Sequence, residues 1–167
     1  NNERFKMLQR FSLNEKEYLH IAGFCKELEL DFISTPFDLE SAKFLAKITD
    51  KIKISSGDNN FSKLISFCID NFKQIFISSG LEDTQAFVDR LTNDLSKSDL
   101  GKVIPLFCVA LYPHDPKHSS VSAIKILKKN YKYFSNIGYS DHTRNNLCAV
   151  IGLAFGARIF EKHFTLD

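Results

Sequence analysis

The stretch GYSDHT, residues 138–143, ends a short apolar run in a serine, an aspartate and a histidine. A helical pattern, NNLCAVIGLAFG at residues 145–156, begins directly after it. The same change occurs near the C-terminus, where ARIFEKHF, residues 157–164, delivers His163 at the end of another apolar run. Two histidines that each finish a strand would meet if the two strands were neighbours in a parallel sheet.

The alternation of strand and helix patterns extends over the whole chain. Six mostly apolar runs predict strands: DFIST (31–35), KIKIS (51–55), QIFIS (74–78), KVIPLFCVAL (102–111), NIGYS (136–140) and ARIFEKHF (157–164). Helical patterns lie between these runs, and the first helix is expected to begin near Ser12, with Glu15 at capping-box spacing. Continuous apolar strands that alternate with helices indicate a parallel sheet covered by helices. The sequence contains no GxGxxG after a strand, so a dinucleotide-binding sheet has no support.

Polar residues gather where the predicted strands end. The polar ends are Ser34-Thr35, Ser55-Ser56, Ser78-Ser79, Ser140-Asp141-His142 and His163-Thr165. Parallel strands place such ends on a single rim, which is where (βα)8 barrels build their active sites. Residues two apart share a face, so Ser140 and His142 lie together, as do Glu161 and His163. The sequence therefore predicts an incomplete α/β barrel of the TIM type, with about six βα units and both histidines inside.

Composition narrows the function classes. Apolar residues make up 44% of the 167 residues, charged residues 25%, and the formal net charge is +2. This near-neutral charge without a basic cluster argues against nucleic acid as a partner. No apolar run approaches the ~20 residues of a membrane span. The four cysteines form no CxxC pair, which favours buried free thiols in a reducing cytoplasm over disulfides or metal ligation.

Several motifs resemble the sialic acid synthase family, that is, the N-acetylneuraminate synthases and their legionaminate, pseudaminate and spore-coat relatives. The matching stretches are FISTPFDLES (32–41), KISSGD (53–58), ISSG (77–80), CVALYP (108–113), GYSDHT (138–143) and EKHFTLD (161–167). They follow the family's order and spacing over nearly the whole chain. The resemblance implies that residues 1–167 form one partial barrel domain carrying barrel strands three to eight. The N-terminal barrel elements and the family's small C-terminal antifreeze-like domain would be absent.

The resemblance implies a carbon–carbon bond-forming transferase. Phosphoenolpyruvate would condense with an N-acetyl sugar aldehyde, such as N-acetylmannosamine, and with water, to give a nine-carbon 2-keto sugar acid and phosphate. His142 and His163 would hold a divalent metal, Mn²⁺ or Mg²⁺, that polarises the aldehyde oxygen. Two neutral imidazoles with open positions beside them suit that task, whereas a closed structural zinc site would need four ligands.

The same resemblance assigns the remaining site residues. Lys53 is the expected anion partner, because a lysine along a barrel strand is costly to bury without one. The expected substrate-binding residues are Thr35, Phe37, Lys53, Ser56, Ser78, Tyr112 and Ser140. Asp58, where the family usually has glutamate, would act in catalysis on the acceptor's hydroxyl or proton, and Asp141 would orient His142 or a backbone amide.

Length and departures from the family pattern leave an alternative open. A full barrel takes about 250 residues, so the chain is expected to be a fragment or a truncated product, inactive alone, whose full-length parent is a homodimer. Asp58 and Ala110 depart from the usual residues, which favours a degenerate, non-catalytic relative that serves assembly or binding. A metal-dependent aldolase is a third possibility that no motif supports. His20, His114 and His118 are expected on the surface.

Overall fold

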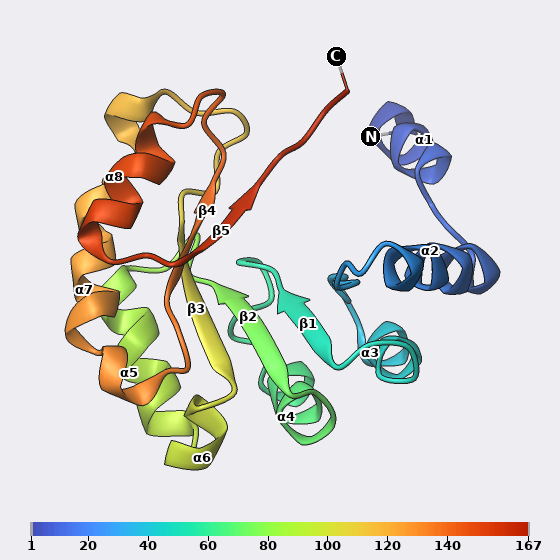
Figure 1. The fold of residues 1–167 in the computed structure, drawn as a ribbon, viewed down its shortest axis with the longest axis horizontal. Coiled ribbons are helices and arrows are strands. Elements are labelled where there is room, and N and C mark those ends of the chain that lie inside the picture. Colours follow the sequence, from blue (N-terminus) through green and yellow to red (C-terminus); the bar gives the residue numbers. More distant parts are fainter. Residues whose placement is uncertain (1, 167) are drawn as a thin grey trace.

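A computed structural model describes residues 2–166 and shows one five-stranded sheet (Figure 1). The strands are β1 (Lys51–Ile54), β2 (Gln74–Ser78), β3 (Val103–Cys108), β4 (Gly138–Asp141) and β5 (Ile159–Lys162). They pair in sequence order, and every pairing is parallel. The sheet curls into a half-barrel with helices around it, which confirms the predicted incomplete TIM-type fold.

Helices connect the strands, as parallel pairing requires. They are α1 (Asn2–Arg10), α2 (Glu15–Glu27), α3 (Leu39–Leu45), α4 (Ser62–Asn71), α5 (Thr84–Asp94), α6 (Lys97–Leu100), α7 (Ile124–Lys129) and α8 (Leu147–Phe155). Three short 3₁₀ turns, at Pro116–His118, Val121–Ala123 and Tyr131–Tyr133, complete the set. Among the described residues, no helix is both long and apolar enough to cross a membrane.

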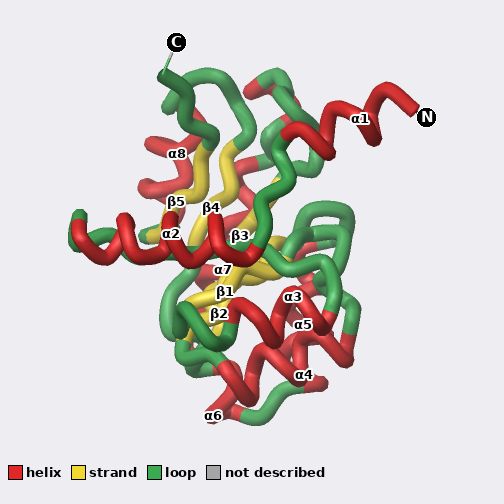
Figure 2. Tube along the Cα trace, turned by 90° about the vertical axis from the view of Figure 1, so that its right-hand side faces the viewer, coloured by secondary structure: helices red, strands yellow, loops and turns green. Residues whose placement is uncertain are grey.

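Helices α5, α7 and α8 line one side of the sheet, and α1 and α2 lie on the other (Figures 1 and 2). The main core forms on the convex face, where Ile52, Ile77 and Tyr139 are completely buried among side chains of the covering helices. The concave face has a much smaller apolar cluster of Phe76, Ile104 and Leu106, with Ile159 packed against it. Helix α2 buries no residue at all.

The predicted strand at residues 31–35 is reduced to one isolated bridge between Ser34 and Ile52. The Ser34 carbonyl accepts a hydrogen bond from the Lys53 amide at 3.1 Å. The segment runs along the edge of β1, and Pro36 follows it directly, a residue without an amide proton to continue the pairing. The first of the six predicted strands, residues 31–35, is therefore an edge segment rather than a full strand.

Local signals at the helix ends also differ from expectation. The capping box of α2 is formed by Asn14 and Glu17, not by Ser12 and Glu15: the Asn14 side chain accepts from the Glu17 amide, and the Glu17 carboxylate accepts from the Asn14 amide at 2.7 Å. Asn is as good an N-cap as Ser, and the competing pair lies only two residues downstream. All four cysteines are free thiols, as predicted, but only Cys68, Cys108 and Cys148 are buried, and Cys25 is partly exposed.

Candidate functional site

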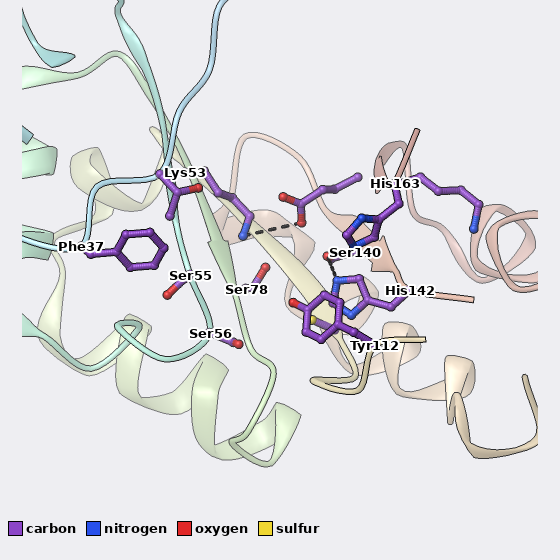
Figure 3. A pocket seen from close by; sticks show the side chains of 13 residues that line it. Phe37, Lys53, Ser55, Ser56, Ser78, Tyr112, Ser140, His142 and His163 are labelled. Carbon is purple, nitrogen blue, oxygen red and sulfur yellow. Dashed lines mark hydrogen bonds and ion pairs between the residues drawn. The ribbon is translucent and has the colours of Figure 1, made fainter. Parts of the chain in front are cut away.

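A pocket of about 330 Å³ lies at the C-terminal ends of the strands, on the concave side (Figure 3). It is lined by Thr35, Phe37, Lys53, Ser55, Ser56, Ser78, Cys108, Tyr112, Ser140, His142, Glu161, Lys162 and His163. Every residue predicted to bind substrate or metal is in this set, so the structure brings them together. Their individual roles stay predictions.

The two histidines meet at the ends of neighbouring strands, β4 and β5. Their ring centroids are 5.7 Å apart at an interplanar angle of 65°. Nδ1 of His142 lies 2.8 Å from the Val109 carbonyl oxygen, which can only accept a hydrogen bond. Nδ1 therefore carries the proton, and the lone pair of the neutral ring is on Nε2, which lies 3.2 Å from the Ser140 hydroxyl.

Burial lowers the pKa of His142 below its usual value, and the neighbouring His163 acts in the same direction. A lower pKa favours the neutral imidazole, which is the form that binds metals. Among residues 2–166, no group of three or more His, Cys, Asp or Glu side chains is arranged to hold a metal ion. An ion held by this pair would take its other ligands from water or substrate, as in an open site, whereas a closed structural site has four protein ligands.

Lys53 is buried, with 9% of its surface exposed, and its partners are distant. Its Nζ lies 3.4 Å from the Ile54 carbonyl oxygen and 3.6 Å from the Glu161 carboxylate (Figure 3). Lys53 is on β1 and Glu161 is on β5, so this contact joins the two outermost strands and shows how strongly the sheet curls. A buried ammonium group with only long contacts is well suited to receive an anion.

Hydroxyl groups line the same pocket as this ammonium group. Ser56, Ser78 and Ser140 line the pocket, and Oγ of Ser78 is buried without a hydrogen-bond partner among the described residues. Gly80, with a φ of +52°, turns the chain so tightly after β2 that a Cβ there would lie 2.0 Å from Cβ of Ser56. Only glycine permits this approach, which places the loop after β1 beside the loop after β2.

Asp58 does not line the pocket. Its Oδ2 accepts a hydrogen bond from the Ser55 hydroxyl at 2.5 Å, and Ser55 itself faces the pocket. Ser55 therefore lies between the Asp58 carboxylate and the pocket. The catalytic role predicted for Asp58 stays a prediction.

Asp141 is fully buried and binds a backbone amide rather than His142. Its Oδ1 accepts from the Thr143 amide at 2.9 Å, and its Oδ2 accepts from Lys162 Nζ at 2.9 Å. Although burial raises the pKa of Asp141, the hydrogen bonds from Lys162 and Thr143 hold it below the usual value. This aspartate therefore fixes the turn that follows β4.

Four further residues line the pocket to which the sequence assigns no role: Ser55, Cys108, Glu161 and Lys162. The alternation of side chains along a strand already puts Glu161 on the face of His163, and the same alternation puts Cys108 on the face of Leu106. His114 was expected on the surface, and this expectation is wrong: it is 7% exposed, and its Nε2 lies 2.8 Å from the Ser119 hydroxyl. His20 and His118 are exposed, as predicted.

Known proteins are similar to this chain over almost its entire length. The chain is 34% identical over 155 residues to the N-acetylneuraminate-9-phosphate synthase of Drosophila melanogaster, covering 92% of this chain and 41% of that protein. It is 32% identical over 167 residues to the N,N'-diacetyllegionaminic acid synthase of Campylobacter jejuni, covering 98% and 49%. The chain spans about half the length of the curated relatives it matches.

A solved structure has the same fold over the whole chain. The N-acetylneuraminic acid synthetase of Leptospira borgpetersenii serovar Hardjo-bovis, in complex with citrate, superposes with a TM-score of 0.90 at 29% identity, covering 100% of this chain and 57% of that one. The model of the NeuB family matches residues 1–167. The chain therefore belongs to the NeuB family.

Proposed function

We propose that this chain forms part of a synthase barrel that condenses phosphoenolpyruvate with an N-acetyl sugar aldehyde, such as N-acetylmannosamine, and with water. The products would be a nine-carbon 2-keto sugar acid and inorganic phosphate. One observation carries the proposal: a buried ammonium group, several hydroxyl groups and two neighbouring imidazoles line a single pocket. The names of the sialic and legionaminic acid synthases among the relatives agree with this chemistry.

The phosphoenolpyruvate end of the pocket would be the Lys53 side. The ammonium group of Lys53 offers charge-assisted hydrogen bonds to the phosphate or the carboxylate. The Ser78 hydroxyl could donate a hydrogen bond to the substrate, because its Oγ has no partner among the described residues. Ser56, Ser140 and Thr35 supply further hydroxyls around the same space.

The aldehyde end would be the histidine side. His142 and His163 would hold a divalent ion, Mn²⁺ or Mg²⁺, which when bound supplies Lewis-acid polarisation of the aldehyde oxygen. The Val109 carbonyl orients the His142 ring by accepting a hydrogen bond from Nδ1, which puts the lone pair of the neutral ring on Nε2, 3.2 Å from the Ser140 hydroxyl. Tyr112 and Phe37, which are 63% and 70% exposed at the pocket, would contact the sugar.

The electron flow follows from the substrates. C3 of the enolpyruvate forms a bond to the aldehyde carbon, water adds at C2, and phosphate leaves with cleavage of its C–O bond. We expect the isolated chain to bind phosphoenolpyruvate without turning it over, because the five strands form only part of a closed barrel. We also propose that the protein works as a homodimer in the cytoplasm.

Calorimetric titration with phosphoenolpyruvate tests the proposal. The unaltered chain should bind it, and Lys53→Met should weaken binding at least about tenfold, as expected when a charge-assisted contact worth ~1.4 kcal/mol or more is lost. Lys73→Met is the matched control, since its ion pair with Asp50 is exposed. Equal affinities for the Lys53 and Lys73 variants would contradict the proposal.

A second candidate is a degenerate, non-catalytic relative that serves assembly or binding. The position of Asp58 behind the pocket wall favours it. The same titration separates the two: a degenerate relative would not bind phosphoenolpyruvate with or without Mn²⁺. A phosphate-release assay with phosphoenolpyruvate, Mn²⁺ and N-acetylmannosamine then measures whether the chain alone has any turnover.

A further inference from the structure

We infer that His114 is a positioning residue that holds the loop after β3 against the pocket and thereby orients His142. The loop, residues 109–119, leaves the sheet at the end of β3 and returns to the protein body at Ser119. Between residues 110 and 118, His114 is the one buried residue of this fully described segment. A buried imidazole in the middle of an exposed loop indicates an anchor rather than a surface histidine.

The anchor is a short chain of polar contacts. Nε2 of His114 lies 2.8 Å from Oγ of Ser119, which is 1% exposed. The same hydroxyl receives the Sγ–H of Cys148 at 3.2 Å, and Cys148 is a buried residue of α8. The loop is therefore tied through Ser119 to a helix of the main core.

The other side of the loop touches His142 twice. The Val109 carbonyl accepts the hydrogen bond from Nδ1 of His142 at 2.8 Å. The Tyr112 ring lies on the His142 ring, with the centroids 3.9 Å apart and the planes 30° apart, although 63% of Tyr112 is exposed. An exposed aromatic ring gains little burial of its own to hold it in place, so its position depends on the backbone that carries it.

These contacts form one continuous connection. The core helix fixes Ser119, Ser119 fixes His114, and His114 is two residues from Tyr112, whose ring covers His142. Groups that hold a functional imidazole from behind commonly decide its orientation. His114 itself does not line the pocket, so it acts through Tyr112 and is no catalytic residue.

A pair of substitutions isolates the hydrogen bond. A glutamine side chain carries its amide nitrogen about as far from the backbone as Nε2 of histidine, whereas asparagine reaches only as far as Nδ1. His114→Gln should therefore keep the bond to Ser119, and His114→Asn should lose it. Ser119→Ala breaks the same bond from the other end, and His118→Asn, at an exposed position in the same loop, is the control.

Solution NMR measures the contact between the Tyr112 and His142 rings in each variant, without metal or substrate. The unaltered chain, His118→Asn and His114→Gln should show nuclear Overhauser contacts between the Tyr112 and His142 rings, and a ring-current shift of the His142 protons. His114→Asn and Ser119→Ala should lose both signals while the amide signals of β1 to β4 stay unchanged. Persistence of the ring contact in these two variants would overturn the inference. Unfolding of the sheet in both would also overturn it, because His114 would then be a general core residue.

The consequence for metal binding rests on the proposed function. Outer partners of metal ligands typically change affinity by about 10- to 100-fold, so His114→Asn should bind Mn²⁺ about tenfold more weakly than His114→Gln. Absence of Mn²⁺ binding in the unaltered chain would count against the proposed function alone, since the ring contact is measured without metal. Loss of the ring contact with unchanged Mn²⁺ affinity would overturn the claim that the loop orients His142.

Discussion

The two faces of the curled sheet are built from the same strands and differ in almost everything else. On the convex face, Ile52, Ile75 and Ile77 are completely buried beneath the helices. Their immediate neighbours on the concave face are Lys53, Phe76 and Ser78, of which the first and last line the pocket. Alternate residues of one strand therefore serve separate purposes: one set stabilises the fold, and the other forms the site.

The concave face also changes along the strands. Its apolar residues, Phe76, Ile104 and Leu106, lie before the strand ends, and its polar residues, such as Ser78 and Ser140, lie at the ends. The three apolar residues do not line the pocket, whereas the polar residues at the strand ends supply its chemical groups. Stability and binding should consequently respond to different substitutions.

The largest effect on stability should come from the convex face. Ile77→Ala removes a fully buried side chain and should lower the free energy of unfolding by about 2–5 kcal/mol, as large-to-small core substitutions do. Urea unfolding followed by circular dichroism measures this, with Leu166→Ala, at a 94% exposed position, as the control. A loss below about 1 kcal/mol would mean that this face is not the principal core.

Gly138→Ala should be nearly as damaging, on the concave face. A Cβ at Gly138 would lie 2.4 Å from Cδ2 of Leu106 and 2.7 Å from the Ile159 carbonyl oxygen, so β5 would have to move. Overpacking of this kind costs about 1–3 kcal/mol. Gly57→Ala is the matched control, because its nearest atom would be 3.7 Å away. Equal unfolding midpoints for the two variants would show that β4 and β5 do not approach as described.

Ser78→Ala should separate stability from binding. Because Oγ of Ser78 is buried without a partner in the described part of the chain, its removal should leave the free energy of unfolding within about 0.5 kcal/mol or raise it. Affinity for phosphoenolpyruvate should fall in the same variant. Calorimetry and urea unfolding on one preparation give both quantities, and a large destabilisation with unchanged affinity would reverse the assignment of the two faces.

The reactivity of the native cysteines tests how well the convex core is protected, and it needs no substitution. Burial raises the pKa of Cys68, beneath the convex face, to about 12, so at pH 8 it is a protonated, unreactive thiol. Cys25 is only partly buried and should react first with a disulfide reagent, whereas Cys68 should react only after the protein unfolds. Mass spectrometry of partially labelled protein identifies the order, and early labelling of Cys68 would show that the convex core opens readily.

Much of this arrangement was accessible from sequence. Apolar runs and parity predicted the parallel sheet, the helix-covered face and the concave orientation of His142 and His163. The extent of pairing was not accessible, because the segment at 31–35 has strand composition but lies at an edge, where only Ser34 forms a bridge. How far a segment pairs depends on which strand lies beside it, and the amino-acid composition of the segment does not determine that.

Side-chain contacts between segments distant in the sequence could not be predicted from the sequence either. The approach of Lys53 to Glu161 depends on how far the sheet curls, and the burial of His114 depends on where its loop meets Ser119. Neither of these two contacts produces a recognisable pattern in the local sequence. Asp58 was placed by its match to a motif, yet its carboxylate bonds to Ser55 instead of facing the pocket.

The most direct test of the account is a Mn²⁺ titration followed by electron paramagnetic resonance. The unaltered chain should bind one ion, His142→Ala and His163→Ala should each abolish that binding, and His118→Ala should leave it unchanged. Binding that survives in both of the first two variants, or no binding by the unaltered chain, would contradict the claim that His142 and His163 share one ion beside Lys53.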